Sequence, residues 1–529
     1  MKQGTYLAAI FAVLAVFAGP ALPQQPSAPA RPEGGPPQQQ KDGTGIVPPG
    51  VKLVPELPAA GAPRAFRFPD AATQTLANGL RVFVISDHSE PAVAARLMIL
   101  SAGSIEDPAE MPGVAQMTAN LLTQGTEKRT AREIAEAIDF IGGSLEGAAG
   151  PDATSVTLKV VKKDLPTGLD VMSDIVLHPS FRGEELERQR QQLLSNLTVE
   201  YSDPDYLASA VFSRALFGRS PYGEPAEGTP ETVQKLAREG LAKFHQASYA
   251  PNQSLLALAG DITPEEAFAA AEKYFGAWPR REIAAAEPAK PAPLHGVHIW
   301  LINKPDAVQT QIRAGKLGIR RADPDYIPVV VMNRIFGGGY NSRLNTEVRI
   351  KKGLTYGAFS AFRAQRYAGS FAVSTFTRTE ATLEALRLVV DLIAHMSTGE
   401  VTQQEMDFAR DYLAGVYPIQ SETAERVADR VLTVAAFDLP ADYNRTYRER
   451  IRAVTSAQVR EMAQHHLSAA DLDIVLTGNV TAFRDALKKA FPDAQYDEIP
   501  FDQVDLLAPS LRKSAAAGQP TPSAPAMPR

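Results

Sequence analysis

Side chains that usually bind catalytic metals or act as nucleophiles are scarce in this chain. Its 529 residues include eight histidines and no cysteine, which excludes disulfides, thiolate metal sites and cysteine nucleophiles. His465 and His466 are adjacent and would point in different directions on a helix. No Gly-x-Ser-x-Gly elbow is present, and Gly337–Gly339 lacks the Gly-Lys-Ser/Thr ending of a phosphate-binding loop. We expect surface or packing roles for all the histidines, which also include His88, His178, His245, His295, His298 and His395.

One segment has the pattern of a metal-binding helix without the ligands. The stretch from Gly113 to Thr126 resembles the signature helix of the M16 (insulinase or pitrilysin-like) metallopeptidases, which carries His-x-x-Glu-His before a Gly-Thr turn. The signature positions hold Gln116, Ala119 and Asn120. In the signature, residues four apart share a helix face, so two imidazoles bind one zinc ion while the glutamate between them activates a bound water.

The third zinc ligand of that family is a glutamate on a later helix. The matching position falls near Ser195 and Asn196, and neither is a carboxylate. Neutral amides are poor zinc ligands beside imidazole or thiolate. We therefore expect no cofactor to be bound by this chain, and zinc to be held by a partner subunit. The degenerate metal-site positions are Gln116, Ala119, Asn120 and Asn196.

A second segment carries side chains suited to stabilising negative charge. The stretch from Phe336 to Tyr356 resembles the C-terminal M16 signature over nearly its whole length. In that family an Arg and a Tyr seven residues apart hydrogen-bond the bound peptide and help stabilise the tetrahedral oxyanion. Arg349 and Tyr356 match this pair in type and spacing. The resemblance implies a catalytic role for both in trans with a partner, since a guanidinium and a phenol donor both stabilise developing charge.

The chain divides into two halves of similar pattern. Each half opens with two predicted strands and a helix, and each ends with a similar apolar strand. Thr130 and Glu133 form a predicted capping box. The resemblance implies an α+β fold of two similar M16-type halves, each a mostly antiparallel sheet with helices packed on one side. The predicted opening strands are Leu80–Ile85, Ala94–Leu100, Val297–Ile302 and Gln309–Leu317, and the predicted helices begin at Gly113 and Asp325.

Composition sets the predicted boundaries. Lys2, the apolar run Tyr6–Ala18 and the small residues that follow predict a signal peptide at 1–21, because the run is shorter than the roughly 20 residues of a spanning helix. We expect a periplasmic or otherwise exported protein with no transmembrane segment after signal cleavage. The other predicted segments are a Pro/Gln-rich flexible tether at 22–65, an N-terminal M16-like domain at 66–283, a linker at 284–295, a C-terminal M16-like domain at 296–507 and a disordered tail at 508–529.

Charge and resemblance together limit the function. The net charge of −6 argues against nucleic acid as a main partner. Some bacterial M16 proteases divide the work between a zinc-binding chain and a chain with a degenerate motif that keeps the Arg/Tyr pair. The resemblance implies that this chain is such a non-catalytic subunit, inactive alone. Its partner would be an M16 subunit with intact His-x-x-Glu-His, and its substrates unfolded peptides. The alternative is a non-enzymatic peptide-binding or scaffold protein of the M16 fold.

Overall fold

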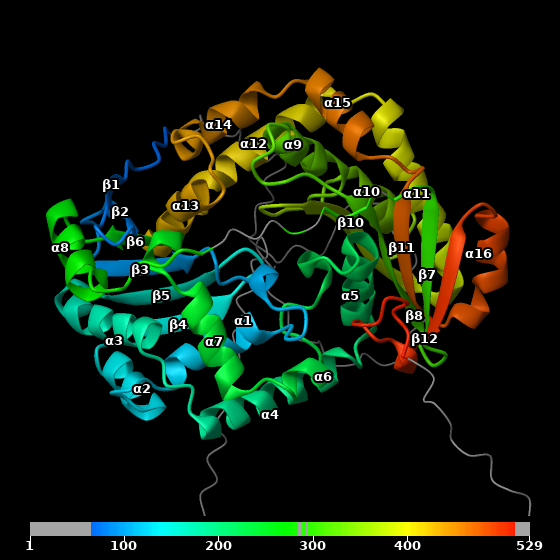
Figure 1. The fold of residues 1–529 in the computed structure, drawn as a ribbon. Helices are drawn as coiled ribbons and strands as arrows, with labels where there is room; N and C mark the ends of the chain where they lie inside the picture. The colour runs from blue at the N-terminus through cyan, green and yellow to red at the C-terminus, as the bar shows by residue number, and fades with distance from the viewer. Residues whose placement is uncertain (1–64, 284–287, 289, 293, 514–529) are drawn as a thin grey trace, which may run out of the picture. The chain divides into compact units, whose positions relative to one another are not determined.

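Two six-stranded sheets, one from each half of the sequence, organise the part of the chain that the structure describes (Figure 1). The structure is a computed structural model that describes residues 65–283, 288, 290–292 and 294–513. The predicted signal peptide at 1–21 and nearly all of the predicted tether at 22–65 lie outside these residues. Parts of the predicted linker at 284–295 and residues 514–529 of the predicted tail also lie outside them.

The first sheet has the strand order β1-β2-β6-β3-β5-β4. Its neighbouring strands are antiparallel except for β2 and β6, which are parallel. The capping box of Thr130 and Glu133 is confirmed at the start of α2. The strands are β1 (Ala72–Thr75), β2 (Arg81–Ser86), β3 (Ala92–Ile99), β4 (Ser144–Ala149), β5 (Thr154–Val161) and β6 (Ser254–Gly260). The helices of this half are α1 (Val114–Leu121), α2 (Ala131–Phe140), α3 (Leu165–Leu177), α4 (Gly183–Glu200), α5 (Pro204–Phe217), α6 (Pro230–Val233), α7 (Arg238–Ser248) and α8 (Pro264–Phe275).

The second sheet has the strand order β12-β7-β11-β8-β10-β9. Strand β7 pairs in parallel with β11 and β12, and the other pairs are antiparallel. The strands are β7 (Val297–Asn303), β8 (Gln309–Leu317), β9 (Ala358–Ala364), β10 (Gly369–Arg378), β11 (Leu472–Gly478) and β12 (Gln495–Pro500). The helices are α9 (Tyr326–Phe336), α10 (Arg343–Asn345), a π-helix (Thr346–Lys351), α11 (Thr382–Thr398), α12 (Gln403–Ile419), α13 (Ala424–Ala436), α14 (Tyr443–Ala453), α15 (Ser456–His466) and α16 (Arg484–Ala490).

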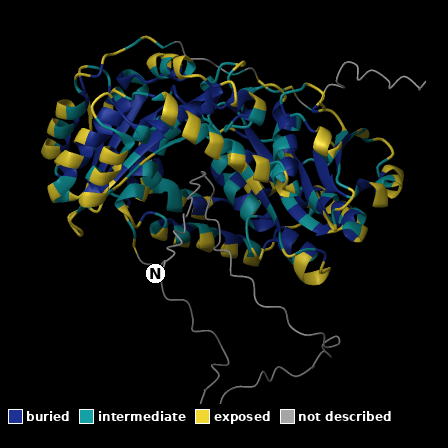
Figure 2. Ribbon diagram, turned by 90° about the horizontal axis from the view of Figure 1, so that it is seen from below, coloured by how far each residue is buried: buried dark blue, intermediate teal, exposed yellow. Residues whose placement is uncertain are grey.

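Each sheet is buried on the face that its own half's helices cover. In β3 the alternate residues Val93, Ala95, Leu97 and Ile99 belong to one apolar core with helices such as α1 and α3. A second core joins β7, β8 and β11 to helices including α9, α11 and α15. Figure 2 shows these strands in the buried colour while many outer helical residues are exposed. The predicted α+β fold of two similar halves is confirmed.

The opposite face of each sheet is covered by a helix from the other half. Helix α13 packs on β3 and β6 of the first sheet, and α5 packs on β8 and β11 of the second. Charged pairs join the exchanged helices to the strands: Arg96 Nη2 lies 3.3 Å from Asp429 Oδ1, and Arg313 Nη2 lies 2.6 Å from Asp205 Oδ1. Each half therefore contributes one helix to the packing of the other half's sheet.

The chain after β12 returns to α5. Leu506 and Leu511 are buried in an apolar cluster that includes Val211 and Phe212 of α5. The buried Arg214 side chain donates from Nε to the Leu506 carbonyl at 2.7 Å. Residues 508–513, which the sequence assigned to the tail, thus contribute to the packing around α5.

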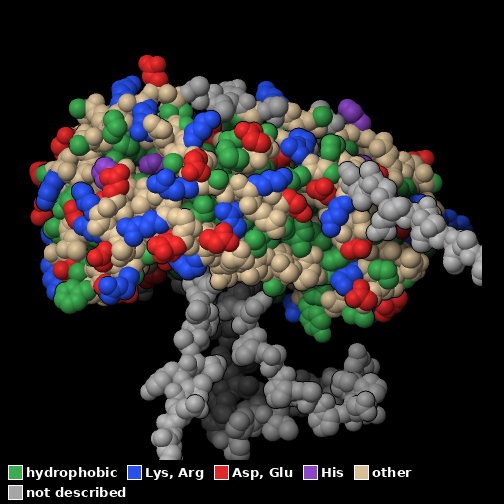
Figure 3. All heavy atoms as spheres, turned by 60° about the horizontal axis from the view of Figure 1, so that its bottom comes forward, with side chains coloured by type: hydrophobic (Ala, Val, Ile, Leu, Met, Phe, Trp, Pro, Cys, Tyr) green, Lys and Arg blue, Asp and Glu red, His purple; other side chains and the backbone are tan. Residues whose placement is uncertain are grey.

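The described surface gives no sign of a membrane span. None of the helices in residues 65–283 and 294–513 combines the length and the apolar character needed to cross a bilayer. On the face shown in Figure 3, acidic and basic side chains are interspersed.

Truncating an α5 core residue should weaken the whole fold. Phe212→Ala removes a buried ring between α5 and the second sheet, so we expect it to lower the free energy of unfolding by about 3 kcal/mol in urea denaturation. The matched control Phe140→Ala truncates a ring that is 92% exposed and should change stability by less than about 0.5 kcal/mol. Equal stability of the two variants would contradict the role assigned to α5.

Candidate functional site

Helix α1 is fixed at its N-terminus by a half-buried carboxylate. Asp107 Oδ2 accepts the backbone N–H of Gly113 at 2.7 Å, and Oδ1 accepts that of Ala115 at 3.0 Å. Burial raises the pKa of the Asp107 carboxyl to about 7, although the two backbone hydrogen bonds favour its charged form. Asp107 therefore positions the helix that carries the degenerate signature, from outside the signature itself.

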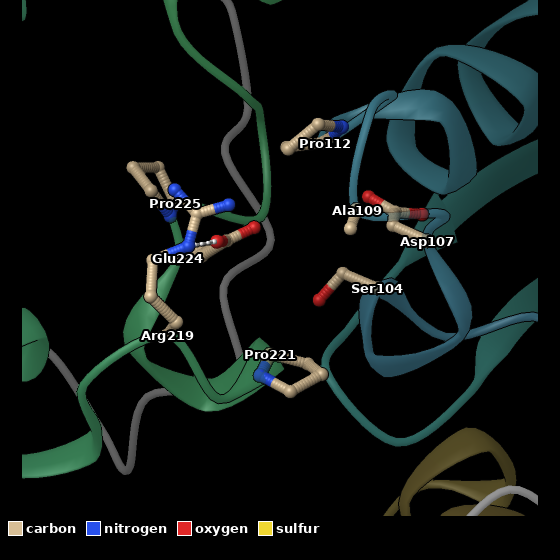
Figure 4. A pocket seen from close by; sticks show the side chains of 8 residues that line it. All are labelled: Ser104, Asp107, Ala109, Pro112, Arg219, Pro221, Glu224 and Pro225. Carbon is tan, nitrogen blue, oxygen red and sulfur yellow. Dashed lines mark ion pairs between the residues drawn. The ribbon is translucent and has the colours of Figure 1, made fainter. Parts of the chain in front are cut away.

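A small pocket of about 210 Å³ lies beside this carboxylate (Figure 4). Figure 4 shows Asp107 and Ser104 on one side, facing Arg219 and Glu224 on the other. Arg219 Nε pairs with Glu224 Oε1 at 3.2 Å, so these two charges compensate each other. Each Asp107 oxygen also accepts one backbone N–H from the start of α1. The other lining residues are Ala109, Pro112, Pro221 and Pro225.

The two amide side chains of α1 are hydrogen-bonded to each other. Gln116 Nε2 donates to Asn120 Oδ1 at 2.8 Å. Ala119, at the position of the family's catalytic glutamate, is buried. Asn196 is exposed on α4, which packs against α1, and its Oδ1 accepts from Gln192 Nε2 at 3.0 Å. The fold thus brings the two helices together, while their polar groups bond within each helix.

These residues do not fit a zinc ion. Zinc prefers imidazole, thiolate and carboxylate ligands, and the degenerate positions offer amides and a methyl group. In the described part of the chain, no group of three or more His, Cys, Asp or Glu side chains is placed to hold a metal ion. Three histidines of the described residues instead lie beside one or two carboxylates. His88 Nδ1 is 2.6 Å from Asp261 Oδ1, and His466 Nε2 is 3.2 Å from Asp325 Oδ2. His298 Nε2 is 2.9 Å from Asp497 Oδ2, and its Nδ1 is 4.0 Å from Asp473 Oδ1.

The edge strand next to α1 is free to accept another strand. Strand β4 ends the first sheet, and a Cβ added at Gly147 would lie 2.9 Å from the Ala119 carbonyl oxygen. Gly150 N–H bonds the Ala153 carbonyl at 2.8 Å, so in this antiparallel ladder Leu145, Gly147 and Ala149 turn their backbone groups outward. Within the described residues these groups have no hydrogen-bond partner. An extended peptide paired with β4 would therefore lie beside the degenerate positions of α1.

The corresponding edge of the second sheet is blocked at the start of β9. The Ser360 N–H of β9 bonds the Gly337 carbonyl at 2.9 Å, and the Ser360 carbonyl accepts from Asn333 Nδ2 at 3.1 Å. The Ala358 N–H donates to Asn345 Oδ1 at 3.2 Å. The start of β9 therefore cannot add a strand, whereas β4 can.

Arg349 and Tyr356 are both presented at the surface. The side chain of Ser342 caps the short helix α10, and the π-helix that follows carries Arg349. Tyr356 is 82% exposed and lies two residues before β9 begins, in the loop that leads into this strand. No hydrogen bond or ion pair joins either side chain to Gln116 or Asn120 within the described residues.

Aromatic rings flank both side chains. The Arg349 Cζ lies 5.7 Å from the centroid of the Tyr340 ring. The Tyr356 ring stacks on Phe376 with centroids 6.4 Å apart. Arg349 has no carboxylate within ion-pair distance in the described part of the chain, so its guanidinium is available to an external acceptor. The sequence analysis missed these aromatic neighbours, although Tyr340 lies within the same signature.

Two family models match the chain in succession. One, described as insulinase (peptidase family M16), matches residues 81–229, and another, described as peptidase M16 inactive domain, matches residues 235–413. The chain belongs to the M16 peptidase family. The degenerate helix of this M16 chain lies in the first matched region, and its Arg/Tyr pair lies in the second.

Relatives of this M16 chain include proteins named as proteases and a protein named as a non-peptidase. An uncharacterised zinc protease of Mycobacterium leprae is 28% identical over 354 residues, which cover 66% of this chain and 79% of the relative. The non-peptidase homolog YmxG of Helicobacter pylori is 24% identical over 412 residues, covering 77% and 94%. A crystal structure of a peptidase M16 inactive domain from Pseudomonas fluorescens has 29% identity and a TM-score of 0.73, covering 77% of this chain and 98% of that one. Family membership alone therefore leaves catalytic activity undecided.

Metal analysis tests the degenerate site directly. We expect the purified wild-type chain to retain far less than one zinc per molecule, because its amides are poor ligands. The combined change Gln116→His, Asn120→His and Asn196→Glu should introduce binding, seen as retained zinc and a zinc-dependent rise in Tm. Alanine at the same three positions is the matched control and should show neither effect. One firmly held zinc in the wild type would refute the degenerate-site interpretation.

Proposed function

We propose that this chain is the non-catalytic subunit of a heterodimeric, zinc-dependent M16 peptidase that hydrolyses unfolded peptides. The partner is an M16 subunit with intact His-x-x-Glu-His, which supplies the zinc ion and the general base. This chain supplies Arg349 and Tyr356 to the partner's site. The predicted signal peptide at 1–21 supports a periplasmic or otherwise exported complex.

One contrast within the chain carries this proposal. The metal positions hold two amides bonded to each other, yet the Arg349 guanidinium and the exposed Tyr356 phenol are positioned for contact with an external group. A guanidinium without a carboxylate partner is a strong donor to a peptide carbonyl or an oxyanion. Such donors contribute to hydrolysis only beside a nucleophile, and the partner's zinc-bound water provides one.

The open edge of β4 supports the choice of substrate. Backbone pairing with an edge strand requires an extended segment, which an unfolded peptide supplies. The same feature favours the alternative function, a peptide-binding or scaffold protein, because strand addition at β4 needs no catalytic group. Kinetics with a partner distinguish the two functions.

Arg349→Ala and Tyr356→Phe should each lower kcat of the mixed complex by about 10²-fold or more, as the loss of an oxyanion donor does. The measurement is hydrolysis of an unfolded peptide by this chain mixed with an M16 subunit that has the intact motif. Either chain alone should show little activity.

Matched substitutions separate a specific role from a general disturbance. Arg378→Ala removes another exposed arginine near the end of β10, and Tyr274→Phe removes a hydroxyl from α8. Both should leave activity unchanged. If the Arg349 and Tyr356 variants also retain full activity, the scaffold function is favoured.

A further inference from the structure

The outer face of α12 exposes two aromatic side chains that the described chain covers only in part. Phe408 is 42% exposed and Tyr412 is 45% exposed, and their rings stack with centroids 6.5 Å apart. They are four residues apart and so lie on one helix face. Exposed aromatic side chains gathered in one place are typical of interaction sites, because their burial by a partner is favourable.

A guanidinium without an acidic partner lies against these rings. The Arg334 Cζ of α9 is 3.5 Å from the Tyr412 ring centroid and 5.6 Å from that of Phe408. Arg334 Nη1 donates to the Gly338 carbonyl, but its buried Nε has no hydrogen-bond partner in the described chain. No carboxylate of the described residues pairs with it. Burial lowers the pKa of this guanidinium, which reflects the cost of holding the charge without a counter-ion.

This surface continues to Arg349. A Cβ added at Gly339 would overlap the Arg334 guanidinium, so the loop after α9 passes directly against this side chain. The next residue is Tyr340, whose ring lies under Arg349. We name Phe408, Tyr412 and Arg334 the α12 patch; it is joined to Arg349 by three consecutive residues, Gly338 to Tyr340.

We propose that the α12 patch is a docking surface for the catalytic M16 subunit, which presents a carboxylate to Arg334 and apolar side chains to Phe408 and Tyr412. The inference rests on the proposed function, in which Arg349 must enter the partner's site. An interface that delivers Arg349 has to include the surface around it, and the α12 patch adjoins it. Charge complementarity specifies the acidic group, because a guanidinium stacked on aromatic rings gains most from a carboxylate.

The test is the affinity of the full-length chain for an M16 subunit with intact His-x-x-Glu-His, measured by sedimentation velocity or calorimetry. Arg334→Gln and, separately, the double variant Phe408→Ser with Tyr412→Ser should each raise Kd by about tenfold or more, as truncation of central interface residues does. Arg334→Gln should also reduce the salt dependence of binding. The matched control Phe140→Ser changes an exposed ring in the first half and should leave Kd within about twofold of the wild type.

Measuring kcat as well as Kd distinguishes a failure of this inference from a failure of the proposed function. At saturating partner concentration the α12 patch variants should recover the kcat of the wild-type complex, because Arg349 and Tyr356 are intact. If these variants bind the partner with wild-type Kd, the docking surface is refuted while the roles of Arg349 and Tyr356 stand. If the patch instead mediates self-association of this chain, the assigned partner is wrong. If the wild-type chain neither binds nor activates any such partner, both proposals fail.

Discussion

Two helices are exchanged between the halves, and the rest of the structure depends on this exchange. Helix α13 covers the face of the first sheet that its own helices leave open, and α5 does the same for the second. Central strands are therefore buried on both faces, which explains why every residue of β6 is buried and why β6 reads as a continuous apolar run. Because neither sheet completes its own core, the two halves are stable as a pair, and the positions of α1 and of the Arg349 segment are fixed by one common packing arrangement.

The degenerate metal-site positions of α1 form a hydrogen-bonded polar site. The hydrogen bond between Gln116 and Asn120 satisfies one donor and one acceptor of these amides. Asp107 binds the backbone at the start of the helix. The helix keeps the residue spacing of the metal-binding signature, but its side chains are not those that bind zinc. This M16 chain retains an edge strand at β4 and two exposed polar side chains, Arg349 and Tyr356, which the proposed role beside another active site requires.

Local sequence patterns predicted much of the fold. The apolar runs of β2, β7 and β8 and the capping box at Thr130 were recognisable because strand alternation and helix capping depend on neighbouring residues. The exchange of α5 and α13 was not predictable in this way, because an apolar pattern shows that a face is buried without showing what buries it. The packing of residues 508–513 was missed for the same reason. The roles of Arg349 and Tyr356 were inferred from a signature, whereas their ring contacts with Tyr340 and Phe376 and the lone charge of Arg334 depend on tertiary structure.

The blocked start of β9 breaks the equivalence of the two halves. Internal duplication would ordinarily give a protein two similar grooves, and so the capacity to hold two ligands at once. The contacts of Gly337, Asn333 and Asn345 with β9 remove one of these grooves. If a peptide adds to β4 as proposed, the matching position at the start of β9 cannot hold a second peptide in the same way.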